Sequence, residues 1–153
     1  MKTFGISLLL AISIAAAALG YGAGAQAAEQ HLALKGYDTV AYFTEKRAMV
    51  GNPQHEYQWD GATYRFVSAK HLEMFKADPD RYLPQYSNWC AASVAKGVKV
   101  RGNPEYWTVV DGRLYLFGGE IGPSLMKADP MAMKSKADKN WEKVSHLPDP
   151  PQD

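Results

Sequence analysis

The segment that decides the fold reads Tyr57-Gln58-Trp59-Asp60-Gly61-Ala62-Thr63-Tyr64-Arg65-Phe66-Val67. Aromatic and β-branched residues, which favour strands, stand on both sides of its central Asp60-Gly61 pair. Asp-Gly is a preferred pair for the two middle positions of a tight hairpin turn, because both positions need a positive φ angle. The segment therefore predicts a β-hairpin.

A second segment with the same pattern follows 51 residues later and reads Trp107-Thr108-Val109-Val110-Asp111-Gly112-Arg113-Leu114-Tyr115-Leu116-Phe117. Without gaps, residues 49–82 and 100–133 share 11 identical residues in 34 positions, where average residue usage predicts about two. Turn chemistry alone would repeat Gly, Asn, Pro and Asp, but it does not explain the matches at Tyr64, Phe66 and Lys76-Ala77. We therefore predict a diverged duplication of one turn-hairpin-helix unit.

Three helices are predicted around the hairpins. The first covers about 68–77 and begins with a serine that can cap it. The second covers 88–96, a helix-forming run that a glycine ends, and the third covers 135–144. Residues 118–123 read Gly-Gly-Glu-Ile-Gly-Pro, which predicts that no helix begins after the second hairpin before about Ser124.

These elements predict the α+β class: a small antiparallel sheet built from the two hairpins, with three short helices, in two diverged halves. We assign residues 1–27 to a signal peptide, 28–147 to a single domain and 148–153 to a flexible tail. Within the domain, the core spans 34–83 and the related second half spans 84–144.

The first 27 residues have the pattern of a secretory signal. Lys2 gives the positive start, Ile6 to Leu19 is almost entirely apolar, and Ala25-Gln26-Ala27 is a small-x-small cleavage pattern. The apolar stretch of about 14 residues is shorter than the roughly 20 that a membrane-spanning helix needs. We therefore expect a periplasmic or secreted protein with no stable membrane span after cleavage.

Charge and cysteine content narrow the classes of function. Removal of residues 1–27 takes away Lys2 and no acid, which leaves 16 basic and 16 acidic residues. A net charge of zero gives no electrostatic argument for binding nucleic acid. Cys90 is the only cysteine, so an internal disulfide is excluded, and a free thiol, a metal ligand or an intermolecular bridge is left.

Three motifs resemble a YHS domain, and they read Leu34-Lys35-Gly36-Tyr37-Asp38-Thr39-Val40-Ala41-Tyr42-Phe43, Trp59-Asp60-Gly61-Ala62-Thr63-Tyr64-Arg65-Phe66-Val67-Ser68 and Phe75-Lys76-Ala77-Asp78-Pro79-Asp80-Arg81-Tyr82. Residues 32–144 as a whole are similar to exported YHS-domain proteins, some of which carry selenocysteine at the position of Cys90. The resemblance implies thiol chemistry at that position. YHS domains also occur on copper and heavy-metal transporting ATPases and in multicomponent enzymes, which implies a soft metal.

The chain departs from that family at the usual metal site. Metal-associated YHS domains carry one cysteine after Asp-Pro-Val and another in a Phe-Cys-Ser segment, whereas this chain reads Asp38-Thr39-Val40-Ala41 and Phe66-Val67-Ser68. Both thiols are missing. A metal site must therefore be built from other residues.

The candidate metal ligands are Cys90, His71 and Asp38. In the first turn of a helix near Asn88, free backbone N–H groups would favour the Cys90 thiolate, but a buried and inert cysteine is the alternative. His71 lies on the first turn of the helix after the first hairpin and could approach Asp38, although a solvated helix position is the commoner outcome for such a residue. Asp38 is either a carboxylate ligand or the residue that forms a turn, and we favour the turn.

The remaining candidates carry weaker signals. His31, His55 and His146 have no spacing typical of metal ligands. A methionine cluster near the C-terminus would suit Cu(I), but such residues more often fill a core, and its members are Met126, Met131 and Met133.

From these residues we expect a secreted YHS-domain binding protein that handles a soft, copper-type metal ion and acts with a metal-transport or redox partner protein. One alternative is a monothiol redox protein that acts through Cys90. Another is a non-catalytic interaction module with exposed aromatics such as Trp89 or Tyr86. A serine triad, a phosphate-binding loop, a dinucleotide fingerprint and a Cys-x-x-Cys pair are absent from the sequence, which favours a binding protein over an enzyme.

Overall fold

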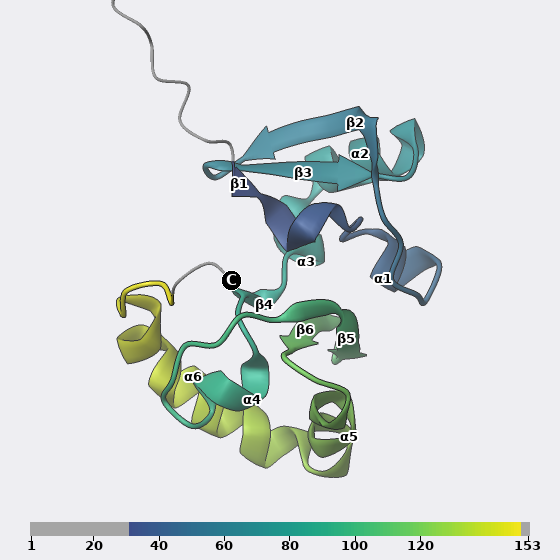
Figure 1. Cartoon of the computed structure of the whole chain (residues 1–153). Coiled ribbons are helices and arrows are strands. Elements are labelled where there is room, and N and C mark those ends of the chain that lie inside the picture. Colours follow the sequence, from purple (N-terminus) through teal and green to yellow (C-terminus); the bar gives the residue numbers. More distant parts are fainter. Residues whose placement is uncertain (1–30, 151–153) are drawn as a thin grey trace, which may run out of the picture.

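The computed structural model describes residues 31–150, so the predicted signal peptide and the last three residues of the predicted tail lie outside the described part. Figure 1 shows two groups of elements, one above the other, each with a hairpin and helices. The α+β class predicted from sequence is confirmed. In the part of the chain that the structure describes, no helix is both long and apolar enough to cross a membrane.

The first half contains a three-stranded sheet with the strand order β1-β3-β2. Its elements are β1 (His31–Leu32), the 3-10 helix η1 (Ala33–Gly36), α1 (Ala41–Thr44), β2 (Asn52–Trp59), β3 (Ala62–Phe66), α2 (Ala69–Ala77) and α3 (Pro79–Tyr82). Strands β2 and β3 form the predicted antiparallel hairpin, and β1 pairs with β3 in parallel. Asp60 and Gly61 have φ angles of 47° and 74°, as the tight turn requires.

The second half has its own two-stranded sheet. Its elements are β4 (Gln85–Asn88), α4 (Ala91–Val94), β5 (Asn103–Val110), β6 (Arg113–Phe117), α5 (Ile121–Ala128) and α6 (Pro130–Ser145). The expectation of one shared sheet was wrong. The free side of β6 is taken by parallel bridges from Pro84 and Cys90, just as β1 takes the free side of β3. Each hairpin is therefore covered by the segment that precedes it, and the two do not pair with each other.

The two halves correspond element by element. The bounds of β5 and β6 are those of β2 and β3 moved by 51 residues, and α5 and α2 end 51 residues apart. Both hairpins also have a register irregularity at the same place, after Asn52 in the first and after Asn103 in the second. The correspondence continues upstream of the aligned sequence, where Lys35 and Ser87 have φ angles of 51° and 52°. This agreement of local geometry supports the predicted duplication.

The helix after the second hairpin begins at Ile121 rather than near Ser124. Gly122 and Pro123 are tolerated because the first N–H groups of a helix have no partner within it, so a proline there loses no hydrogen bond. A Cβ atom on Gly122 would lie 2.5 Å from Cβ and Cγ of Phe117. Glycine is therefore needed for the close approach of α5 to β6.

Of the three predicted helices, one has the expected length and two differ. Helix α2 matches its prediction, and the Ser68 side chain accepts a hydrogen bond from the His71 backbone N–H. Helix α4 has only four residues and follows Cys90, which lies outside it. Helix α6 begins five residues earlier than predicted, because Asp129 caps it by accepting from the Ala132 N–H. The short helices α1 and α3 were not predicted.

A shared core joins the two halves. One buried cluster combines Leu34 and Tyr42 of the first half with Leu114 and Leu116 of the second. The Tyr42 hydroxyl donates to the backbone carbonyl of Pro104 at 2.8 Å. Burial raises the pKa of Tyr42, because a phenolate would lose its hydration there.

Candidate functional site

The site begins with Asp38, which is fully buried between η1 and α1. Its Oδ1 atom accepts hydrogen bonds from the backbone N–H groups of Val40 and Ala41, at 2.8 and 3.2 Å. Its Oδ2 atom accepts from the N–H of Val67, just after β3, at 2.8 Å. Asp38 therefore caps the start of α1 and ties it to the hairpin, which is the turn-forming role favoured from sequence.

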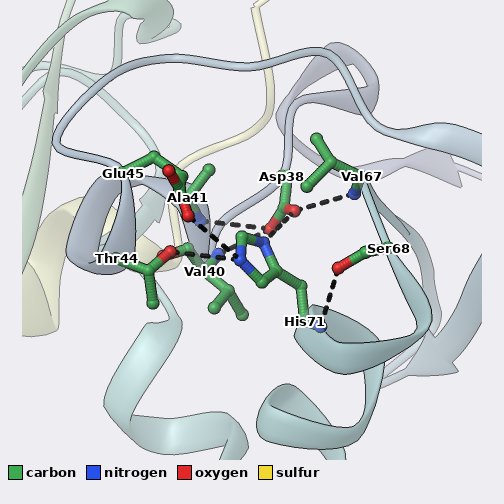
Figure 2. Close-up of polar contacts among 8 residues, drawn as sticks. All are labelled: Asp38, Val40, Ala41, Thr44, Glu45, Val67, Ser68 and His71. Carbon is green, nitrogen blue, oxygen red and sulfur yellow. Dashed lines mark hydrogen bonds and ion pairs between the residues drawn. The ribbon is translucent and has the colours of Figure 1, made fainter.

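The imidazole of His71 forms a further hydrogen bond with Oδ2 of Asp38. Because Ser68 caps α2, His71 lies in its first turn and points toward Asp38, as Figure 2 shows. Its Nδ1 atom lies 2.7 Å from Asp38 Oδ2, and its side chain is only 7% exposed. The sequence favoured a solvated His71 over one that approaches Asp38, and that preference was wrong, because the side chain is buried against the carboxylate.

The hydrogen bond with Asp38 fixes the imidazole of His71. When Asp38 is ionised it only accepts, so Nδ1 of His71 carries the hydrogen, and in the neutral ring the lone pair of Nε2 faces the Thr44 hydroxyl. Nε2 faces the end of α1, where Thr44 Oγ1 is 3.2 Å away and Glu45 Oε1 is 3.7 Å away (Figure 2). The Glu45 side chain is 46% exposed. The buried pair thus presents one basic nitrogen toward the surface.

The sequence does not predict α1, and Glu45 is therefore absent from the candidate ligands. Asp38 is a residue type that caps helices, and recognition of that cap would have started a helix near Ala41. Glu45 directly follows that helix. The signal was therefore present, but the helix is one turn long and too short for a periodicity argument.

Cys90 lies in a different part of the core from the other two predicted ligands. It is 6% exposed and belongs to a buried cluster of the second half with the residues Tyr86, Trp89, Ala91, Val94, Tyr115, Phe117, Met126, Ala137 and Val144. A side chain on Gly118 would come within 3.9 Å of its sulfur. The structure therefore brings Asp38 and His71 together, and it packs Cys90 among apolar side chains.

The three predicted ligands do not form one metal site. Within residues 31–150, no group of three or more His, Cys, Asp or Glu side chains is arranged to hold a metal ion. Asp38 already accepts four hydrogen bonds, so it fits the role of an outer partner that orients a ligand. Nε2 of His71 and the Glu45 carboxylate do fit, because two ligand atoms, each about 2.1 Å from one ion, can lie 3.7 Å apart.

The predicted methionine cluster is divided between core and surface. Met126 is fully buried and Met133 packs against the same cluster, whereas Met131 is 73% exposed. Met126 therefore fills the core. Two of the other histidines lie at the surface: His31, whose Nε2 is 3.5 Å from the Asn88 amide, and His146 after α6.

Comparison with known proteins gives no match to a family model, to a curated protein or to a solved structure. The resemblance to the YHS family therefore stays a prediction from the motifs of the sequence.

Proposed function

We propose that this chain is an exported binding protein of the YHS class that handles a transition-metal ion of the copper type, bound by His71 Nε2 and the Glu45 carboxylate. The observation that carries the proposal is the 2.7 Å contact between Asp38 and His71 Nδ1, which leaves Nε2 on the side of Thr44 and Glu45. The leader predicted at residues 1–27 supports export.

The arrangement matches a common way of preparing a histidine for metal binding. A carboxylate on one ring nitrogen fixes the tautomer and raises the basicity of the other nitrogen. Asp38 is held by three backbone N–H groups as well, so it cannot turn away from the ring without losing them. The imidazole therefore meets the ion in a fixed orientation.

The donor atoms favour a copper-type ion in its divalent form. Imidazole and carboxylate suit Cu(II), whereas Cu(I) prefers thiolates and thioethers. Among divalent first-row metals, a nitrogen and oxygen site of unspecialised geometry binds Cu(II) most tightly. Since two protein ligands leave positions for water or for a partner's ligand, and Glu45 is partly exposed, the site is suited to passing an ion on.

Copper titration of the chain after removal of residues 1–27 tests the proposal. We expect one Cu(II) per chain, with nitrogen coupling in the electron paramagnetic resonance spectrum. Glu45→Gln should weaken binding at least tenfold, about 1.4 kcal/mol, and should leave the fold intact because its side chain is exposed. His71→Gln should remove the nitrogen coupling.

Three control variants separate this site from other copper ligands. Glu73→Gln changes an exposed carboxylate on the same helix as His71, and His31→Ala removes an exposed imidazole elsewhere. Cys90→Ser removes the thiol. All three should bind copper like the wild type. Loss of binding only in Cys90→Ser, or unchanged binding in both Glu45→Gln and His71→Gln, contradicts the proposal.

The two alternatives have less support. A redox thiol must be reached by its partner, and Cys90 is 6% exposed within an apolar cluster. The aromatics considered for an interaction surface are buried, with Trp89 8% and Tyr86 2% exposed. Metal binding at His71 is therefore favoured over both alternatives, because Asp38 orients the His71 ring toward a partly exposed carboxylate.

A further inference from the structure

Trp89 lies against two cationic side chains in a region away from His71. Lys99 Nζ is 4.7 Å from the centroid of its rings, and Arg101 Cζ is 5.2 Å away. Trp89 and Arg101 are directly paired in an antiparallel bridge, so their side chains lie on the same face, and Lys99, two residues before Arg101, lies there too. The indole attracts both cations through its ring electrons.

Among residues 31–150, the hydrogen-bond and ion-pair partners of Lys99 lie at the end of α6 and in the segment after it. Its Nζ atom donates to the backbone carbonyl of Leu147 at 2.8 Å and forms an ion pair with Asp149 at 2.8 Å. It is also 3.4 Å from the carbonyl of Ser145. The lysine on this indole is therefore neutralised by a carboxylate of the chain itself.

Among residues 31–150, Arg101 has no carboxylate partner of this kind. Its Nε and Nη2 atoms are buried and form no hydrogen bond within the described part of the chain. These two N–H groups point from the same edge of the guanidinium, with the spacing that matches the two oxygens of a carboxylate. A buried charged donor without an acceptor is costly, and such a group calls for a missing ion or ligand.

We propose that this edge of Arg101 binds the carboxylate of a ligand, beside the indole of Trp89. A single carboxylate is favoured over a phosphate because, once Asp149 has neutralised Lys99, the site has one uncompensated positive charge. Arg101 as a residue is partly exposed, so the edge lies just below the surface. Binding of a carboxylate therefore includes movement of the side chains that cover this edge of Arg101.

Nuclear magnetic resonance titration of the copper-free chain tests this site without reference to the proposed metal function. The signal is the Nε–H resonance of Arg101, and the probes are succinate and a peptide of four glutamates, with inorganic phosphate for comparison and sodium chloride at matched ionic strength. We expect a saturable shift of that resonance with a carboxylate probe and not with chloride. Saturation by succinate identifies a small-molecule site, and saturation by the peptide alone identifies an acidic segment of a partner.

Conservative variants decide whether the two-donor edge is responsible. Arg101→Lys keeps the positive charge and loses the two-donor edge, so it should weaken carboxylate binding at least tenfold. Because this variant has no Arg101 Nε–H, its binding is measured by the shift of the Trp89 indole N–H resonance. Arg113→Lys makes the same change at an exposed position and should leave the binding unaltered. The proposal is overturned by the absence of a saturable shift with both probes, by equal binding in Arg101→Lys, or by tighter binding of phosphate than of either carboxylate.

Discussion

Asp38 and Cys90 occupy corresponding positions in the two halves of the molecule. The Asp38 N–H donates to the Met49 carbonyl, and the Cys90 N–H donates to the Val100 carbonyl, both at 2.8 Å. Each residue then leads into a four-residue helix. The backbone hydrogen bond is therefore the same, whereas one side chain is a carboxylate with four hydrogen bonds and the other a thiol in an apolar cluster.

Helices α2 and α5 also carry a polar residue in the first half and an apolar contact in the second. His71 on α2 corresponds, 51 residues later, to Gly122 on α5. In the second half, α5 lies so close to β6 that a Cβ on Gly122 would overlap Phe117. There is no room for an imidazole at that place. The first half therefore holds a buried polar pair where the second half has a closely packed apolar contact.

The largest expected difference between the halves is in the cost of removing these two side chains. Asp38→Ala would leave three backbone N–H groups and the His71 ring without their acceptor, so we expect it to lower the free energy of unfolding by about 4 kcal/mol. Cys90→Ala removes only a small apolar group and should cost about 1 kcal/mol. Urea unfolding measures both. Equal costs would show that the Asp38 network does not stabilise the first half.

A smaller effect is expected at the place where α5 approaches β6. Gly122→Ala should lower the free energy of unfolding by about 2 to 3 kcal/mol, because the added methyl group overlaps Phe117. The matched control is Gly119→Ala, where a Cβ has no neighbour within 4 Å and the cost should be below about 0.5 kcal/mol. Thermal or urea unfolding compares the two. A similar cost for both variants would mean that α5 can move away from β6.

The smallest effect concerns Tyr64 and its counterpart Tyr115 at alkaline pH. Burial raises the pKa of Tyr64 to about 12, and burial also raises the pKa of Tyr115. Between pH 10 and 12 the unfolded chain has lost a proton that folded Tyr64 retains, so stability falls as the pH rises. In Tyr64→Phe the slope of the unfolding free energy against pH should be shallower by up to about 1.4 kcal/mol per pH unit.

Urea unfolding at several values between pH 9 and 12 measures that slope. Tyr115→Phe serves as the comparison from the other half and should change the slope in the same direction. An unchanged slope in Tyr64→Phe would mean that this phenol ionises equally well in the folded and unfolded chains.

The parts of the site that could be predicted are those with local signals. Ser68 is a capping residue in front of a helix-forming run, and this alone put His71 in the first turn of α2. Asp38 was recognised as a turn former from its neighbours. Glu45 was not found, since its nearness to His71 joins residues 26 positions apart and depends on how α1 packs against α2.

In the fold as well, features with a local sequence signal could be predicted, and features that depend on distant residues could not. Asp-Gly pairs between strand-forming residues determined both hairpins, and the repeated spacing determined that the chain has two related halves, because turn geometry depends on residues next to each other. Only the tertiary structure decided that the hairpins belong to separate sheets, that Cys90 is buried and that α5 begins at Ile121. Those outcomes depend on which distant segment covers a strand edge or fills the space beside a glycine, and close packing between distant residues leaves no local pattern in the chain.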